Sequence, residues 1–273
     1  MAVTFVVVPQ WQGSGSSRAM RLVDGAQAIR NDLPASSTVV VDVPLEAGDE
    51  QGTTVSRLSS LRLVRDRQLQ VLRSLDDIAV TIGGDCGVEL AAVEHALRDP
   101  DVAVVWFDAH ADANSPTSSP SGAFHGMVLR TLLGDGPDAL VPAAPLRADR
   151  VILAGTRAVD DAEAEYLSTA GIPTLSGTDL TPESLVAAID ASGATSVYLH
   201  IDLDVLDPAE IGGIGYPEPF GLSAVDLVAL IRAVKDRFTL AGAGLVEFAP
   251  GSEEQASDDL PTILRLLGAL TRK

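Results

Sequence analysis

Short runs of consecutive apolar residues alternate along the chain with longer segments in which apolar positions recur every three or four residues. Apolar side chains on consecutive positions are typical of strands buried on both faces of a parallel sheet. Their alternation with helices favours an α/β fold of three layers, with a central parallel sheet of about eight strands. The runs predicted as strands are Val3–Val8, Thr38–Val43, Ile78–Ile82, Val102–Phe107, Val151–Ala154, Pro173–Leu175, Val197–Ile201 and Ala243–Phe248.

Helical spacing and helix-start signals predict helices between most of these runs. Thr181 is followed by Pro182, and this pair is typical of a helix start because threonine caps free N–H groups and proline fits the first helical position. Ser223 with Asp226 gives a similar signal. The predicted helices cover residues 17–33, 55–75, 185–189, 227–234 and about 258–270.

The composition fits a globular protein and narrows the range of partners. Of the 273 residues, 46% are hydrophobic and 21% are charged, which excludes a disordered or collagen-like chain. There are 19 Lys and Arg against 38 Asp and Glu, so the formal net charge is −19. A surface of this charge repels nucleic-acid phosphates and anionic lipids, and we expect neither as a partner. No repeat or linker divides the sequence, which predicts a single domain over residues 1–273.

The single cysteine and the N-terminal segment favour a cytoplasmic protein. Cys86 has no second cysteine in the chain with which to form a disulfide, as expected for a reducing compartment. The first apolar run has no basic segment before it and no cleavage site of small residues after it. No apolar run approaches the ~18 residues that a membrane span needs. The chain therefore reads as one without a leader or a membrane segment.

Acidic residues and a histidine follow two of the predicted strands. Asp108, His110 and Asp112 come directly after the fourth run, and Asp202 and Asp204 follow the seventh. In open α/β sheets, ligands bind beyond the carboxyl ends of the strands. Residues two apart on a strand point to the same face, so each set is expected to converge. Four carboxylates this close would repel one another unless cations lay between them, and oxygen with imidazole donors suits Mn²⁺.

Together with Gly83-Gly84-Asp85, these two acidic motifs resemble the three signatures of the ureohydrolases, the family of arginase, agmatinase and formiminoglutamase. The resemblance extends from about Gly83 to Pro250 and implies a three-layer arginase-like fold. It also implies two Mn²⁺ ions and a bridging hydroxide that attacks the guanidino carbon of the substrate. Asp108 and Asp202 would be shared by both ions. The implied metal ligands are Cys86, Asp108, His110, Asp112, Asp202 and Asp204.

The resemblance also implies which residues act on the guanidino group. His125, in Phe124-His125-Gly126, matches a histidine that passes a proton to the leaving amine, a role that suits a group titrating near neutral pH. Glu247 matches the carboxylate that faces the guanidinium group. Asp112 counts both as a catalytic residue and as a metal ligand. Tyr216 stands near the guanidinium pocket, where a smaller threonine is usual.

A long loop of small residues, 113–124, and a later motif indicate the other end of the substrate. Asn114 and Ser121 follow Asp112 at a spacing similar to that of the arginase residues that hold a substrate α-carboxylate. Asp160 matches an arginase aspartate that binds the α-amino group, whereas Ala158 replaces a second aspartate. These residues favour an amino acid substrate over agmatine, which has no α-carboxylate.

Two departures from the family pattern bear on the metals and the substrate. Cys86 stands where the family has a metal-binding histidine, and His200 replaces a small hydroxyl residue. A thiolate is itself a metal ligand, and its added negative charge makes the ion that it binds a weaker Lewis acid. Its softness leaves Zn²⁺ and Co²⁺ open beside Mn²⁺.

The weakened metal pair favours Nω-hydroxy-L-arginine as the substrate, with hydroxyurea and L-ornithine as products. The whole sequence is similar to ureohydrolases that carry out this reaction in D-cycloserine, and hence antibiotic, biosynthesis. An ordinary arginase or another guanidino-acid hydrolase is the alternative enzyme. A non-catalytic homologue with few metal ligands is a third reading, for which Cys86 is the main argument. The oligomeric state is left open.

Overall fold

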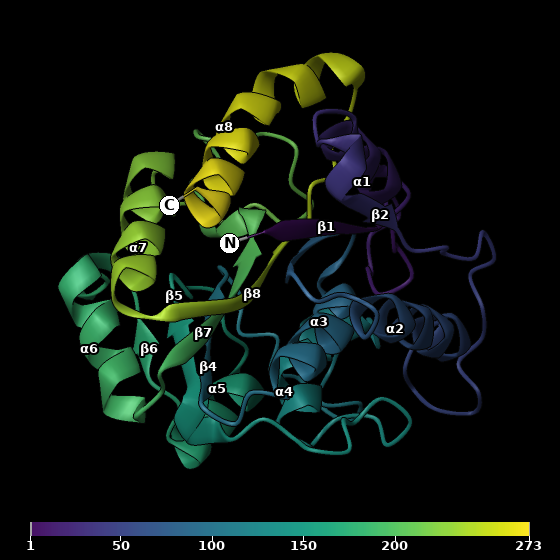
Figure 1. Cartoon of the computed structure of the whole chain (residues 1–273). Helices are drawn as coiled ribbons and strands as arrows, with labels where there is room; N and C mark the ends of the chain where they lie inside the picture. Colours follow the sequence, from purple (N-terminus) through teal and green to yellow (C-terminus); the bar gives the residue numbers. More distant parts are fainter. Residues whose placement is uncertain (1, 273) are drawn as a thin grey trace.

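The computed structural model describes residues 2–272 and is built around one sheet of eight strands, all parallel (Figure 1). The strand order across the sheet is β2-β1-β3-β8-β7-β4-β5-β6. Each run predicted as a strand contributes one, although β2 is shorter and β8 begins earlier than predicted. The strands are β1 (Val3–Val8), β2 (Thr38–Val40), β3 (Ile78–Gly83), β4 (Val102–Phe107), β5 (Val151–Ala154), β6 (Thr174–Leu175), β7 (Ser196–Asp202) and β8 (Thr239–Val246).

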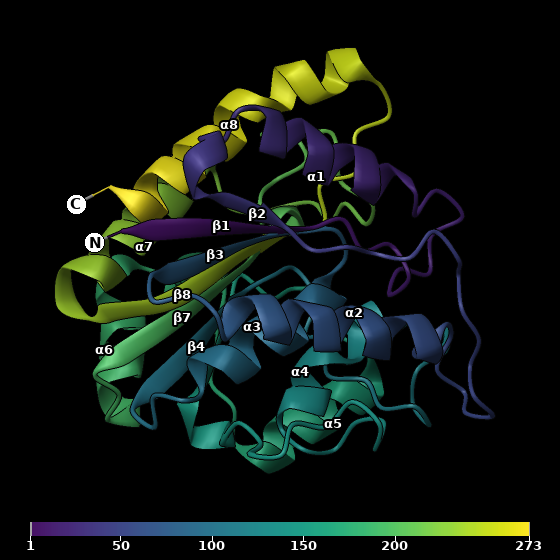
Figure 2. The same cartoon turned by 45° about the vertical axis from the view of Figure 1, so that its right-hand side comes forward.

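Helices cover both faces of the sheet, which confirms the three layers (Figure 2). One face carries α1 (Arg21–Asn31), α6 (Pro182–Ser192), α7 (Ala224–Arg237) and α8 (Glu253–Thr271). The other carries α2 (Leu58–Leu72), α3 (Glu89–Ala96), α4 (Val128–Leu132) and α5 (Asp161–Ala170). Within residues 2–272, none of the helices combines the length and hydropathy that a membrane span requires.

The predicted helix-start signals are confirmed, but the start of the last helix differs from the prediction, and some helices on one face of the sheet were not predicted. Thr181 accepts a hydrogen bond from the Ser184 backbone N–H (3.2 Å), and Ser223 accepts one from Asp226 (3.1 Å). The last helix begins at residue 253, five residues before the predicted start, because Ser252 caps it. Helices α3, α4 and α5 were not among the predicted segments. They are short, and in α3 five consecutive residues are buried, so no apolar face stands out.

Alternation along β7 divides its side chains between the two layers. Val197, Leu199 and Ile201 pack into the core beneath α6 and α7. Tyr198, His200 and Asp202 occupy the alternate positions and point to the α2–α5 side of the sheet. A strand buried on both faces normally carries apolar residues on both. The polar face of β7 therefore indicates a special environment near its carboxyl end.

Candidate active site

Four neighbouring strands bring the predicted ligands together. Cys86 lies three residues after β3, Glu247 follows β8, Asp202 ends β7 and Asp108 follows β4. In the sheet these strands lie side by side in the order β3-β8-β7-β4. Because all the strands are parallel, their carboxyl ends meet at one edge. Residues separated by up to 161 positions in the sequence thus come into contact there, as the Cys86 N–H donates to Glu247 Oε1 (3.1 Å).

Potential metal donors form three overlapping groups at this edge. In each group the donor atoms lie within 4.8 Å of one another. Asp108 belongs to two of the groups and Cys86 to two, so the three are continuous. The groups are Cys86, Asp108, Asp112 and His200; Cys86, Asp202 and Glu247; and Asp108, His110 and Asp204.

The acidic motifs converge for a different reason from the one predicted. β4 ends at Phe107, so the residues after it are not on a strand and do not alternate. The chain turns there: the His110 N–H donates to Asp108 Oδ1 (2.7 Å), and Asp112 has a left-handed backbone with φ of 51°. Similarly, Asp204 lies in a short 3₁₀ turn after β7, where its N–H donates to Asp202 Oδ1 (2.8 Å). Turn geometry, not strand alternation, aims these side chains.

Backbone strain also marks the site. Asp112 and Glu247 are two of the few non-glycine residues with positive φ, and Glu247 has φ of 65°. Such conformations cost about 1–3 kcal/mol and persist where the surroundings hold them in place. The Glu247 N–H donates to the Gly84 carbonyl (2.8 Å), which fixes the turn after β8. Both strained residues direct a carboxylate into the same cluster.

The cluster is electrostatically strained without cations. Burial, followed by repulsion from neighbouring carboxylates, raises the pKa values of Asp112 and Asp202 well above their usual range. The same causes raise the pKa of Asp204 to about 6. Against the effect of burial, contacts with Asp108 and Asp204 raise the pKa of His110 to about 12. Divalent cations would relieve this repulsion. The oxygen, imidazole and sulfur donors therefore fit the implied metal ions.

Cys86 points into this cluster. Its side chain is 1% exposed, and its sulfur donates to Asp202 Oδ2 at 3.1 Å. Burial, with repulsion from Asp202 and Asp112, raises the pKa of the Cys86 thiol. Without a metal ion the cysteine is a thiol, and binding a cation would release its proton. A cysteine turned into the apolar core would have excluded this role.

A cavity of about 330 Å³ opens above the cluster. The long loop 113–124 forms one wall, as its length and composition favoured. Asn114 and Asp160 lie on that side, with Asn114 Nδ2 donating to Asp160 Oδ2 (3.1 Å). All the residues predicted to contact substrate line the cavity, namely Asn114, Ser121, His125, Asp160, Tyr216 and Glu247.

His125 lies against Tyr216 and close to Glu247. The two rings stack with centroids 5.0 Å apart and an interplanar angle of 28°. His125 Nδ1 is 3.9 Å from Glu247 Oε1. Burial lowers the pKa of His125 to about 4, so its imidazole is neutral at pH 7. A neutral imidazole beside a carboxylate can accept a proton from solvent and pass it on.

The chain is similar to known proteins over most of its length. The model of the arginase family matches residues 14–264. The chain belongs to the arginase family. An N(omega)-hydroxy-L-arginine amidinohydrolase of Streptomyces lavendulae is 28% identical over 263 residues, which cover 94% of this chain and 93% of that protein. An arginase of Entamoeba histolytica is 25% identical over 273 residues, covering 93% and 92%.

A solved structure shows the arginase-like fold directly. The crystal structure of Entamoeba histolytica arginase in complex with L-ornithine matches with a TM-score of 0.88. The sequences are 24% identical, and the match covers 99% of this chain and 98% of that one. The predicted three-layer arginase-like fold is confirmed.

Two residues that hold the arginase-family site in place were not singled out from the sequence. Asp85, within the glycine motif, accepts hydrogen bonds from Gln10 Nε2 (3.0 Å) and the Gly13 N–H (2.9 Å). It thereby ties the loop after β1 to the end of β3. Arg157 donates to the carbonyls of Asp204 and Glu218, both at 2.8 Å. No periodic pattern in the sequence signals such contacts.

Proposed function

We propose that this protein hydrolyses the guanidino group of an arginine-like amino acid, with Nω-hydroxy-L-arginine as its preferred substrate. The products are then hydroxyurea and L-ornithine. The observation that carries the proposal is a cysteine-containing acidic cluster at the floor of a cavity lined by both guanidino-facing and amino-acid-facing residues. In this proposal the whole chain is one catalytic domain that works in the cytoplasm.

Two Mn²⁺ ions are the proposed cofactors, with Zn²⁺ or Co²⁺ as possible replacements because of the sulfur donor. Asp112 and Cys86 would hold one ion, and His110 and Asp204 the other. Asp108 and Asp202 would be shared. Asp108 belongs to a donor group with Cys86 and to one with His110, and Asp202 contacts the Cys86 sulfur and accepts from the Asp204 backbone N–H, which supports that role. When bound, the two cations supply a hydroxide nucleophile at neutral pH by lowering the pKa of water.

The residues around the cavity would orient the substrate and move its protons. Glu247 faces the guanidinium group and offsets its positive charge. As the C–N bond to the ornithine nitrogen breaks, that nitrogen needs a proton, and His125 delivers it from solvent. The position of His125 on the cavity wall, with Nδ1 at 3.9 Å from Glu247 Oε1, supports this assignment.

The far end of the cavity would recognise the amino acid. Asn114 and Ser121 are proposed to hold the α-carboxylate, and Asp160 the α-ammonium group. The Asn114–Asp160 hydrogen bond presents an amide N–H and a carboxylate side by side, as a zwitterion requires. Tyr216, stacked on His125, narrows the guanidino end of the cavity.

Cys86 supports the hydroxylated substrate over arginine. A thiolate adds negative charge to its metal ion and makes it a weaker Lewis acid. An Nω-hydroxyguanidine carries an oxygen that can itself bind a metal ion, and more strongly Lewis-acidic ions would hold it in place of the hydroxide. It is also less basic than a guanidine, so weaker Lewis acids can suffice for its hydrolysis. The similarity to the Streptomyces lavendulae hydroxyarginine amidinohydrolase across most of the chain supports the same substrate.

An ordinary arginase is the second candidate, favoured by the comparable similarity to the Entamoeba histolytica arginase. The test is turnover of Nω-hydroxy-L-arginine, L-arginine, agmatine and guanidinobutyrate by Mn²⁺-loaded protein, with metal content measured on the same sample. We expect near two metals per chain and the highest kcat/KM for hydroxyarginine. A higher value for arginine would establish the second candidate. Absence of metal and of turnover would instead support a non-catalytic homologue.

A further inference from the structure

His200 is a buried histidine to which the proposed reaction gives no role. It is fully buried in the middle of β7, and its ring stacks on Trp106 with centroids 3.5 Å apart and an interplanar angle of 18°. Trp106 is its register partner on β4, and Gly244 is its partner on β8. The stack fixes the plane of the imidazole, so its two nitrogens have defined directions.

The two nitrogens of His200 face different carboxylates. Nδ1 is 3.3 Å from Glu89 Oε2, and Nε2 is 3.5 Å from Asp108 Oδ2. Neither nitrogen meets hydrogen-bond geometry with any partner among the described residues. Buried polar atoms without partners are costly and need an explanation. An imidazole that is buried, oriented by stacking and unpaired on its cluster-facing nitrogen is typical of a ligand without its ion.

Glu89 is placed for this imidazole by the fold. It lies at the start of α3 and is fully buried, and it accepts a hydrogen bond from the Tyr198 hydroxyl (2.9 Å). Its carboxylate occupies the space above Gly244, where a Cβ atom would come within 1.9 Å of Oε1. A glycine in β8 thus makes room for a charged side chain inside the protein. On β7 it faces the Tyr198 hydroxyl and the His200 imidazole.

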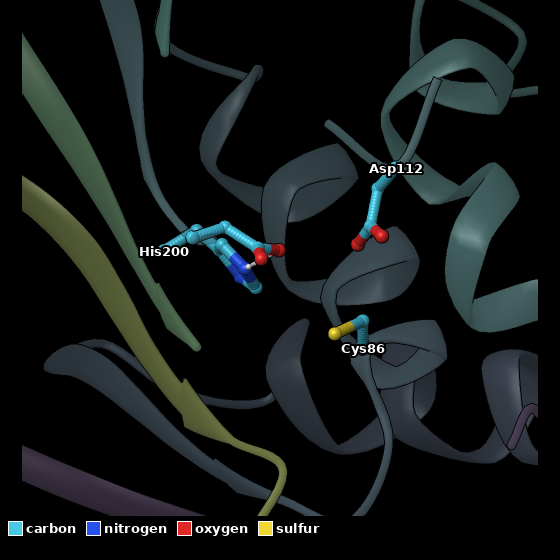
Figure 3. A group of neighbouring side chains, drawn as sticks. Cys86, Asp112 and His200 are labelled. Atoms are coloured by element: carbon cyan, nitrogen blue, oxygen red, sulfur yellow. Dashed lines mark ion pairs between the residues drawn. The ribbon is translucent and has the colours of Figure 1, made fainter. Parts of the chain in front are cut away.

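The donor atoms of His200, Cys86, Asp108 and Asp112 lie within 4.8 Å of one another. Figure 3 shows the labelled side chains of Cys86, Asp112 and His200 directed towards a common space. Metal-binding histidines usually donate their second ring N–H to a carboxylate, which orients the ring and raises its basicity. Glu89 Oε2, at 3.3 Å from His200 Nδ1, lies close enough to become such an acceptor after a small shift.

We propose that His200 Nε2 is a ligand of the metal ion held by Cys86, Asp108 and Asp112, and that Glu89 accepts the His200 Nδ1–H. The inference rests on the proposed metal dependence. The imidazole that is missing at position 86 would then be supplied from position 200. The ion gains a thiolate and keeps an imidazole, a donor set that softer divalent metals favour.

The test is titration of the metal-free protein with Co²⁺, in which a charge-transfer band reports cobalt bound to the Cys86 thiolate. His200→Gln should lower the Co²⁺ affinity of the site that gives this band by at least about 10–100-fold, the usual cost of losing a residue that supports a metal ligand. The other site should keep its affinity. Glu89→Gln should weaken the same site less, because the amide oxygen can still accept from Nδ1. His95→Gln, at a histidine on the same helix α3 but outside the cluster, is the control and should change neither site.

A crystal structure of the Co²⁺-loaded wild type completes the test without any variant. We expect His200 Nε2 at about 2.0–2.2 Å from the ion that binds sulfur. Two bound ions with Nε2 beyond 3 Å, or unchanged affinity in His200→Gln, would overturn this inference and leave the proposed hydrolase standing. Failure of the wild type to bind Co²⁺ or Mn²⁺ would instead remove the proposed metal dependence itself.

Discussion

The two halves of the acidic cluster differ in what they face. One half consists of Asp108, His110 and Asp204; its His110 and Asp204 line the cavity, and the His110 side chain is 31% exposed. The half around Cys86 and His200 lies below it, with both side chains buried. The first half carries the residues that the family signature predicts. The departures from that signature are concentrated in the second.

This difference separates two ways of choosing a substrate. Residues on the cavity wall select by direct contact with the amino acid. A buried cysteine contacts no substrate, and it would act through the Lewis acidity of the ion that it binds. The kind of donor atom that binds an ion is one of the ways in which proteins tune metal sites. Substrate choice would then depend on the floor of the cavity as much as on its walls.

Removing a ligand common to both halves should have the largest effect. Asp202→Ala takes away a carboxylate that contacts Cys86 directly and supports Asp204 through its backbone N–H. We expect metal content to fall from near two per chain to near zero, and turnover to fall to background. Elemental analysis of purified protein measures the first. Asp190→Asn, on the exposed part of α6, is a control that should keep both metals.

Loss of the proposed proton transfer by His125 should leave metal binding unchanged. His125→Ala removes the proposed proton carrier, and kcat should drop by ~10²–10⁴, the usual range for general acid–base catalysis. Metal content should stay near two per chain, since His125 is outside the ligand groups. Steady-state kinetics and metal analysis on one sample decide the matter. Unchanged kcat would take His125 out of the mechanism.

The strands and the cavity-facing half of the site could be predicted from local patterns in the sequence. Continuous apolar runs predicted all eight strands, and Asp108, His110 and Asp204 stand in compact motifs directly after two of them. The turn at Asp112 was not foreseen, because a positive φ at a non-glycine residue has no sequence signature. The side chains of the motif converge as expected, although the strand geometry assigned to them was wrong.

The buried half depends on contacts between distant segments. Glu89, Gly244 and His200 come from α3, β8 and β7, and each is unremarkable within its own segment. Glu89, Gly244 and His200 come into contact only because the strand order of the sheet places their segments side by side. The same holds for Asp85, which holds the loop after β1. Single-sequence reasoning noticed His200 as a departure but had no means of finding its partners.

Replacing Cys86 by the histidine that is usual in the family tests most directly whether the buried half of the cluster determines substrate choice. Cys86→His removes one negative charge and should strengthen the Lewis acidity of the pair. We expect the kcat/KM ratio of hydroxyarginine to arginine to shift towards arginine by about tenfold, on the order of 1.4 kcal/mol in differential transition-state binding. Hydroxyarginine should also become a better inhibitor of the variant.

A variant in the cavity wall should change substrate affinity without changing substrate preference. Asn114→Ala should raise KM for both substrates without reversing the preference, because the α-carboxylate is common to them. An unmoved ratio in Cys86→His would mean that the cysteine is incidental. The protein would then be an arginase in its substrate choice.

The last expected effect is on stability: the metal-free and the metal-loaded protein should differ in how their stability depends on pH. In the metal-free protein, burial and repulsion from Asp108 raise the pKa of Asp204 from 3.8 to about 6. Above pH 6 the folded chain carries the full cost of this buried charge. As pH falls from 6 to 4, folded Asp204 takes up a proton before the unfolded chain does, so the metal-free protein is stabilised by this group. The metal-loaded protein behaves oppositely, because protons compete with cations for the same donors.

The midpoint of thermal unfolding should therefore differ most between the two forms near pH 8 and converge towards pH 5. At a metal concentration of ~100 times Kd, one site adds about 2.7 kcal/mol. That is on the order of 5–10 °C in a domain of this size. Parallel melting of dialysed and Mn²⁺-loaded samples across this pH range gives the difference directly. Asp204→Asn removes the titration and should flatten the metal-free profile. A gap that widens as pH falls would show that the acidic cluster is not where protons and metals compete.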